Sequence, residues 1–291
     1  MRVRRRSLLM AGAAGLAGCS LAPDQDHTGP DAPRTTALRR PVCTAWVLSS
    51  GGPRGFVHVG VLKALQELQL RPDLIVGASA GALVGCLCAS GMPATAIEAL
   101  ALDLQAWSLG RLALGTPERL SGSAVADLVR ERARVPLLDQ MPVAMACVAL
   151  RRSDGTAVAF TAGDAGLAVQ ASTAIEGQFS PVRIRGQRYA DPDWSTPLPV
   201  RIARALGAQR VLAVDASAHV DRAPPGAERY RESDLRKKAL IDTDAALADL
   251  LLKPDFGYWV SLSREFRERA MAAGYRATMA QAEALRALHA G

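Results

Sequence analysis

The chain is poor in the residues that hold metals or cross-link small domains. It has 5 cysteines and 4 histidines among 291 residues, and neither type shows the paired spacing of a zinc site. Cys86 and Cys88 lie two residues apart in an expected helix and so face different ways. We therefore expect no metal, no cofactor and no disulfide framework. We expect the four cysteines after Cys19 to be buried as small apolar side chains.

A long apolar run and a strong charge imbalance are also absent. The apolar stretch from Leu8 to Ala17 is too short for a membrane-spanning helix. The formal charge is +7, but four of the 35 basic residues are arginines within residues 2–6, and the remaining 31 face 28 acidic residues. This weak, scattered excess argues against nucleic-acid binding and allows only mild attraction to anionic lipid head groups. At 49% hydrophobic residues the chain should be folded for most of its length.

The first residues are typical of an export signal. Residues 1–18 combine an arginine-rich start with a short apolar stretch, and their end, Leu16-Ala17-Gly18-Cys19, resembles the lipobox of bacterial lipoproteins. That resemblance implies cleavage before Cys19, acylation of its thiol with fatty acids such as palmitate, and a membrane anchor. An ordinary signal peptide with an incidental cysteine is the alternative. The twin arginine Arg5-Arg6 also resembles a second type of export signal.

The residues after Cys19 predict where the protein resides and how it is divided. Ser20 stands where an aspartate would resemble an inner-membrane retention signal, which favours the outer membrane of a cell envelope that has one. Residues 19–41 are rich in Pro, Asp, Thr and Arg and predict a flexible tether. Residues 42–291 are then expected to form one domain that ends in charged helices from Glu232 onward, which pack as a structural cap. The alternatives are that these helices cover the site or touch the membrane.

Strand and helix patterns alternate through this domain. Apolar runs at 43–49, 74–76, 143–150 and 210–215 predict strands, and helical spacing recurs between them. Such alternation predicts a mostly parallel central sheet with helices on both faces, a three-layer α/β/α fold. Sites in such sheets form at the carboxyl ends of the strands, where two glycine-rich turns are expected.

The second turn carries a nucleophile pattern. Gly77-Ala78-Ser79-Ala80-Gly81 fits G-x-S-x-G between a strand and a helix, the context of a nucleophile elbow. In such an elbow Gly77 and Gly81 prevent clashes in a tight turn that exposes Ser79, and the following helix dipole favours negative charge there. A tightly packed small-residue helix start is the alternative.

The first turn favours the catalytic interpretation. Gly51-Gly52-Pro53-Arg54-Gly55 ends the preceding strand, so it should lie beside Ser79. Its N–H groups at Gly51, Gly52, Arg54 and Gly55 are candidates for stabilising an oxyanion. A dinucleotide-binding loop is the alternative, but the G-x-G-x-x-G order and its ribose-binding acid are missing. Arg54 could hold the loop by bonding main-chain carbonyls, or it could be exposed.

Several ordered motifs together resemble the patatin family. They are the glycine segment 50–62, the nucleophile segment 72–83, the stretch 171–182, and the aspartate segment of 189–191 with 197–200. The resemblance covers roughly 43–215 and implies a patatin-like fold, a Ser79–Asp191 dyad without histidine, and hydrolysis of lipid or phospholipid esters.

Three of the four histidines lie at positions from which we expect no contact with Ser79. This agrees with the dyad without histidine that the resemblance implies. His27 lies in the expected tether, His289 at the C-terminus, and His58 in the helix after the glycine loop. His219, which follows a strand end, is the one candidate third member of a triad. A plain turn aspartate is the alternative for Asp191.

The chain departs from the family pattern at two places. Asp191 is followed by Pro192-Asp193 where the family has small residues, and Ser50 replaces a glycine. Pro192 fixes its own φ and favours an extended Asp191, so Asp193 could take part or catalysis could be impaired. The sequence therefore predicts a serine acyl hydrolase that works through an acyl-enzyme. The alternatives are a lipid-binding protein without turnover and an acyltransferase that uses the same site.

Overall fold

The computed structural model describes residues 25–105, 109–113, 117–118 and 120–290. The strands are β1 (Asp26–His27), β2 (Thr44–Leu48), β3 (Leu74–Ala78), β4 (Arg111–Leu112), β5 (Leu120–Ser121), β6 (Ala144–Arg151), β7 (Ala157–Phe160), β8 (Val182–Ile184), β9 (Gln187–Ala190), β10 (Arg210–Val214) and β11 (Leu250–Leu252). The helices are α1 (Phe56–Glu67), α2 (Ala80–Ala89), α3 (Ala94–Asp103), α4 (Ser123–Arg132), α5 (Ala165–Ser172), α6 (Val200–Ala205), α7 (Arg231–Ala245), α8 (Arg264–Met279) and α9 (Ala282–Ala290).

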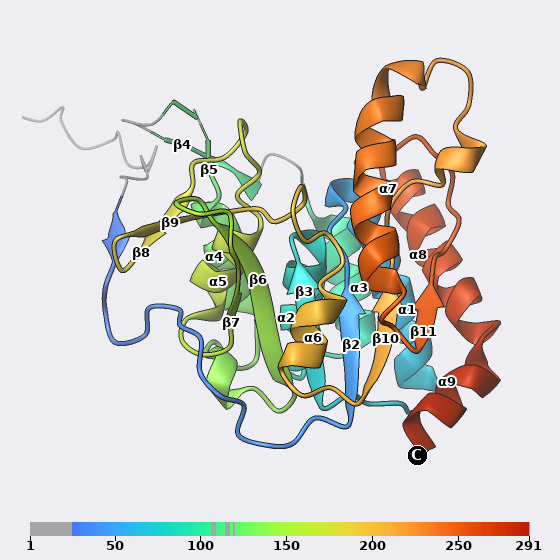
Figure 1. Ribbon diagram of the computed structural model, residues 1–291, viewed down its shortest axis with the longest axis horizontal. Coiled ribbons are helices and arrows are strands. Elements are labelled where there is room, and N and C mark those ends of the chain that lie inside the picture. Colours follow the sequence, from blue (N-terminus) through green and yellow to red (C-terminus); the bar gives the residue numbers. More distant parts are fainter. Residues whose placement is uncertain (1–24, 106–108, 114–116, 119, 291) are drawn as a thin grey trace, which may run out of the picture.

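One mixed sheet forms the centre of the molecule (Figure 1). Its order is β1-β8-β9-β6-β3-β2-β10-β11, with β7 paired to β6. The run from β6 to β11 is parallel, whereas β9 and β7 lie antiparallel to β6. The mostly parallel sheet predicted from the alternating pattern is therefore confirmed, and the carboxyl ends of β2 and β3 lie side by side.

Each central strand sends alternate side chains to two separate cores. On β2, Trp46 and Leu48 pack with residues of α1, α2 and α5, while Ala45 and Val47 pack with residues of α6 and α7. Because side chains alternate across a strand, a fully apolar strand can bury both of its faces. This produces the predicted α/β/α layers, with α6 and α7 on one face of the sheet and α1, α2 and α5 on the other.

The C-terminal helices form part of the packed domain. Helix α8 lies against α1 at a very short distance, because Gly60 and Gly274 leave room for the facing main chain. A Cβ at Gly60 would lie 1.8 Å from the Met271 carbonyl oxygen, and one at Gly274 would lie 2.2 Å from that of Val57. The prediction that the C-terminal helices pack as a structural cap agrees with this contact. Within the described residues, no helix is both long and apolar enough to cross a membrane.

The segment from residue 26 onward, expected as part of a flexible tether, instead lies against the domain. Strand β1 pairs in parallel with β8, Arg34 forms a bridge with Ala162, and Ala32 is buried. The main-chain N–H of Thr36 also donates to Thr161 Oγ1 at 2.8 Å. The prediction of a flexible tether is wrong for these residues. A short polar segment can become ordered by pairing with the edge of a sheet, and amino-acid composition does not show such pairing.

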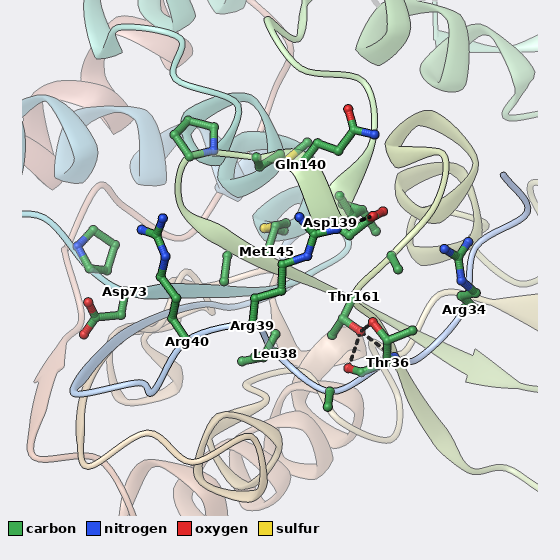
Figure 2. A pocket seen from close by; sticks show the side chains of 17 residues that line it. Arg34, Thr36, Leu38, Arg39, Arg40, Asp73, Asp139, Gln140, Met145 and Thr161 are labelled. Atoms are coloured by element: carbon green, nitrogen blue, oxygen red, sulfur yellow. Dashed lines mark hydrogen bonds and ion pairs between the residues drawn. The ribbon is translucent and has the colours of Figure 1, made fainter.

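This docked segment forms one wall of a polar cavity of about 580 Å³ at the amino ends of β3 and β6 (Figure 2). Arg34, Arg39, Asp73 and Asp139 are among its lining residues, and Arg39 is paired with Asp139 at 3.3 Å. The cavity lies at the edge of the sheet opposite the two glycine-rich turns. The catalytic chemistry predicted from the sequence therefore has no place in it.

The cysteines differ in part from the expectation that all four are buried. Cys86 and Cys147 are buried, Cys88 is half-buried and Cys43 is exposed. Cys43 directly precedes β2 at the amino edge of the sheet. All four are free thiols, and Cys19 lies outside the described residues, as does the whole of segment 1–18.

Candidate active site

Ser79 occupies a strained turn between β3 and α2. Its φ of 52° lies in the left-handed region that non-glycine residues rarely adopt. The flanking glycines permit the turn, since a Cβ at Gly77 would lie 2.5 Å from the Gly81 carbonyl oxygen and one at Gly81 would lie 2.2 Å from that of Leu48. The geometry predicted for a nucleophile elbow, with Gly77 and Gly81 beside the serine, is present.

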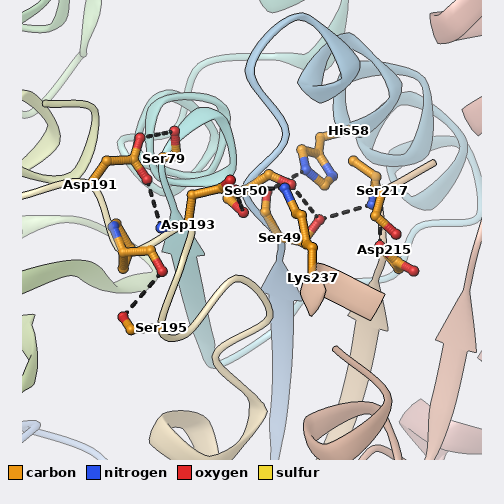
Figure 3. Close-up of polar contacts among 12 residues, drawn as sticks. Ser49, Ser50, His58, Ser79, Asp191, Asp193, Ser195, Asp215, Ser217 and Lys237 are labelled. Carbon is orange, nitrogen blue, oxygen red and sulfur yellow. Dashed lines mark hydrogen bonds and ion pairs between the residues drawn. The ribbon is translucent and has the colours of Figure 1, made fainter. Parts of the chain in front are cut away.

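The Ser79 hydroxyl donates a hydrogen bond to Asp191 (Figure 3). Its Oγ lies 2.5 Å from Asp191 Oδ2, although the two residues are 112 positions apart in the chain. Asp191 follows β9, and its own N–H donates to the Ala174 carbonyl at 2.9 Å. Both side chains are buried, at 4% and 7% relative exposure. The serine and aspartate that the resemblance pairs are thus in direct contact.

The surroundings of Asp191 disfavour its charged form. Burial raises the pKa of this carboxyl to about 7, and the nearby Asp193 charge acts in the same direction. Hydrogen bonds from Ser79 and from the Asp193 N–H, together with the Lys237 charge, lower the pKa and offset part of the rise. A carboxylate with a pKa near 7 is suited to accept a proton at neutral pH.

The two departures from the family pattern, Ser50 and the Pro192-Asp193 pair after Asp191, lie next to each other (Figure 3). Pro192 leaves Asp191 free to contact Ser79, and the next N–H, that of Asp193, donates to Asp191 Oδ1 at 2.9 Å. The Asp193 carboxylate in turn accepts hydrogen bonds from Ser50 Oγ and from Lys237 Nζ. Sequence reasoning noted Asp193 and Ser50 but gave no sign of Lys237, which arrives from α7.

The glycine loop lies beside this pair, and its N–H groups differ in availability. Within the described residues, the N–H groups of Gly51 and Gly52 donate no hydrogen bond. The Arg54 N–H donates to the Gly51 carbonyl at 3.0 Å, so it is already engaged inside the loop. Gly55 has a packing role, because a Cβ there would lie 2.3 Å from Ala80 Cβ. Gly51 and Gly52 therefore have N–H groups that are free to donate to an oxyanion.

The Arg54 side chain holds the loop from the other side. Its guanidinium donates to the main-chain carbonyls of Gly257 and Tyr258, and lies 5.6 Å from the Tyr258 ring centroid. Of the two predictions made for this side chain, bonding to main-chain carbonyls is confirmed. The segment before α8 is thereby tied to the glycine loop.

A serine to which the sequence analysis gave no role holds the main chain of Ser79. Ser172, at the end of α5, accepts the Ser79 N–H at 2.9 Å and donates to the Val148 carbonyl at 2.5 Å. The bond fixes the Ser79 main chain in its strained turn. The hydroxyl connects Ser79, which follows β3, to Val148 of β6. Its role therefore depends on how β3, β6 and α5 are placed in the fold.

The histidines contact other groups. His58 is fully buried and its Nε2 lies 2.9 Å from the Ser49 carbonyl, and burial lowers its pKa to about 4. His219 Nε2 lies 3.4 Å from the Pro254 carbonyl. Neither contact involves Ser79 or Asp191, so the titratable side chain in contact with the serine is that of Asp191. Across the described ranges, no group of His, Cys, Asp and Glu side chains could hold a metal ion.

Ser79 lies on the wall of an apolar cavity of about 360 Å³. The wall comes from the glycine loop and from helices α1, α2, α3 and α4, and among its apolar side chains are Phe56, Leu83, Ile97 and Val125. Such a lining suits a hydrocarbon chain and offers few polar partners. The site therefore combines a serine bonded to a buried carboxylate with an apolar space next to it.

This fold and this strand–serine–helix turn define an α/β protein with a nucleophile elbow. The chain belongs to the patatin-like phospholipase family, whose sequence profile matches residues 46–204. The match includes the glycine loop, Ser79 and Asp191. The family predicted from the motifs is confirmed.

Two relatives share part of this chain's sequence. An uncharacterized NTE family protein of Mycobacterium tuberculosis is 31% identical over 173 residues, which are 58% of this chain and 48% of that protein. Lysophospholipase NTE1 of Mycosarcoma maydis is 29% identical over 184 residues, 61% of this chain and 10% of that protein. The chain thus matches about half the length of the mycobacterial relative and a tenth of the fungal one.

A solved structure has the same fold. VipD from Legionella pneumophila superimposes with a TM-score of 0.58 at 15% identity, over 84% of this chain and 67% of the other. At this identity the similarity concerns the fold alone. It agrees with the α/β/α architecture and the mostly parallel sheet described above.

Proposed function

We propose that this protein is a serine acyl hydrolase that cleaves carboxylic ester bonds of lipids. Ser79 is the nucleophile and Asp191 is its base. The observation that carries the proposal is the 2.5 Å hydrogen bond from Ser79 Oγ to Asp191 Oδ2 at the wall of an apolar cavity. Membership of the patatin-like phospholipase family supports a lipid substrate.

The geometry supports a two-step reaction. Asp191 takes the Ser79 proton as Oγ attacks the ester carbonyl carbon, and the N–H groups of Gly51 and Gly52 stabilise the oxyanion. The intermediate collapses to an acyl-enzyme when the alcohol leaves with the proton from Asp191. Water then gives a proton to Asp191 as its oxygen attacks the acyl carbon. The bond to Ser79 Oγ breaks, the fatty acid leaves, and Asp191 returns the proton to Ser79 Oγ. The acyl chain occupies the apolar cavity throughout.

The proposal includes a location. Cys19, acylated after cleavage of residues 1–18, would anchor the protein to a membrane of the cell envelope, with the outer membrane favoured by Ser20. The lipobox pattern in the sequence supports this anchor. An anchored enzyme would meet its lipid substrate at the membrane surface.

A soluble ester separates the two residue roles from general effects on the fold. With p-nitrophenyl butyrate and the full-length chain in detergent, Ser79→Ala and Asp191→Asn should each lower kcat/KM by on the order of a thousandfold. Ser153→Ala, a change at an exposed turn serine, should leave kcat/KM within twofold. Wild-type turnover that survives in Ser79→Ala would contradict the proposal, as would a folded wild type without turnover on short and long acyl esters.

A further inference from the structure

Large apolar side chains are exposed next to the candidate active site. Tyr230, Trp259, Val260 and Leu262, here called the aromatic edge, are between 39% and 47% exposed. A soluble domain seldom exposes two aromatic and two aliphatic side chains together without a partner for them. We therefore use the residues next to this edge to infer what it binds.

The aromatic edge is one connected surface. The Tyr230 and Trp259 rings lie edge to face with centroids 6.2 Å apart, and Trp259 lies 5.1 Å from Tyr258. Tyr230 directly precedes α7 and the segment 258–262 precedes α8, so both belong to the end of the molecule at which α7 and α8 start (Figure 1). Segments 28 residues apart or more thus contribute to the same exposed face.

The edge is continuous with the candidate active site. Leu262 is both 41% exposed and part of the wall of the cavity that contains Ser79. The Tyr258 carbonyl accepts a hydrogen bond from Arg54 of the glycine loop. An apolar path therefore leads from the exposed edge into the cavity, past the residues next to the proposed oxyanion donors.

Arginine side chains accompany the exposed rings. Arg229 lies 4.6 Å from the centroid of Tyr230, and Arg236 lies 5.9 Å from that of Trp194, which is itself 46% exposed. Arg229, Arg231 and Arg236 are exposed and form no ion pair with a described residue, while Glu228 and Glu232 are exposed acids nearby. Aromatic rings with adjacent arginines suit the interface of a bilayer, where rings enter the head-group region and cations meet phosphates.

We propose that the aromatic edge docks on a lipid bilayer and delivers the acyl chain of a membrane lipid past Leu262 into the cavity. The inference rests on the proposed function, since the cavity must receive a lipid. A protein partner or a second copy of this chain could cover the same surface. The continuity of the edge with a hydrocarbon-lined cavity favours the bilayer, because a protein partner would leave the cavity without an occupant.

Local insertion can be measured with the full-length chain and vesicles of phosphatidylcholine and phosphatidylglycerol that carry brominated acyl chains. Bromine quenches tryptophan fluorescence only when the ring enters the bilayer. We expect quenching in wild type and loss of a large part of it in Trp259→Phe, whether or not an anchor also holds the protein. Vesicle binding without quenching of Trp259 would overturn the proposal.

Activity provides a second, independent measurement. Trp259→Asp combined with Val260→Asp, neither of which lines the cavity, should lower hydrolysis of vesicle phospholipid at least tenfold and leave p-nitrophenyl butyrate turnover within twofold. The matched control is Leu247→Asp with Leu251→Asp, two leucines of 42% and 40% exposure away from the edge, which should change neither rate. Equal loss in both double variants would contradict docking by the edge.

The outcomes separate the two proposals. Absence of turnover of both short and long p-nitrophenyl esters by folded wild type means that the proposed function fails, whatever the vesicles show. Soluble-ester turnover without quenching of Trp259 means that only the docking proposal fails. A dimer in sedimentation velocity that Trp259→Asp with Val260→Asp converts to a monomer, without bilayer quenching, would assign the edge to self-association instead.

Discussion

At the scale of single residues, the protonation of Asp191 depends on two charged neighbours, the acidic Asp193 and the basic Lys237, which shift its pKa in opposite directions. The pKa of Asp191 is raised to about 7, mainly by burial; the Asp193 charge contributes to the rise and the Lys237 charge opposes it. Because Lys237 Nζ lies 2.5 Å from Asp193 Oδ1, the two charges are held as a pair within reach of Asp191. The pair therefore has a predictable effect on the pH dependence of a reaction in which Asp191 is the base.

The two neighbours should shift the pH profile in opposite directions. The ionised form of Asp191 is the active one, so log(kcat/KM) should rise with pH and level off above about 7. Lys237→Met removes the charge that favours the carboxylate, which should move the midpoint to higher pH. Asp193→Asn removes the charge that disfavours it, which should move the midpoint to lower pH. The measurement is a pH series of kcat/KM on a soluble ester.

A merely structural role for this pair would give a different result. Both variants would then lower activity at every pH without moving the midpoint. Lys237→Arg retains the positive charge and should keep the wild-type midpoint. Midpoints that move in the same direction in Lys237→Met and Asp193→Asn would contradict the electrostatic account.

At the scale of elements, close glycine contacts set how the helices meet the sheet and each other. In the α1–α8 contact, a methyl group at Gly60 would meet the main chain of Met271 rather than a flexible side chain. Gly60→Ala should therefore destabilise the fold by about 3 kcal/mol despite the higher helix propensity of alanine, which is a fall in Tm of several degrees.

The matched control for this change is Gly29→Ala. No atom lies within 4 Å of a Cβ built at Gly29, so its Tm should stay within about one degree of wild type. Thermal unfolding followed by circular dichroism makes the comparison. A Gly60→Ala protein as stable as the Gly29→Ala protein would show that α8 packs on α1 less closely than described.

The central elements could be predicted from the sequence, whereas the two outermost strands, β1 and β11, could not. Apolar runs and flanking glycines predicted β2, β3, α2, β6 and β10 to within a few residues, since these elements are buried on both sides. Strands β1 and β11 are two and three residues long and were not predicted. Their order comes from pairing with β8 and β10, and tertiary pairing leaves no periodicity in so short a segment.

At the scale of the whole molecule, the candidate site combines residues that no local pattern connects. The G-x-S-x-G pattern identified the turn at Ser79, but the contact with Asp191 crosses 112 residues and was implied only by resemblance to a family. Ser172 lies in the family-like stretch 171–182 but received no role, and Lys237 lies in none of the motifs. The roles of both depend on contacts made only in the folded chain. The aromatic edge likewise arises from two distant segments that each resemble ordinary loops.

The central claim is that Ser79 is a nucleophile that becomes acylated. A fluorophosphonate reacts covalently with activated serines and can be located by peptide mass spectrometry. We predict one adduct, on the peptide that contains Ser79, no adduct in Ser79→Ala, and much slower labelling in Asp191→Asn. A folded wild-type protein that stays unlabelled, or that carries its adduct on another serine, would contradict the account.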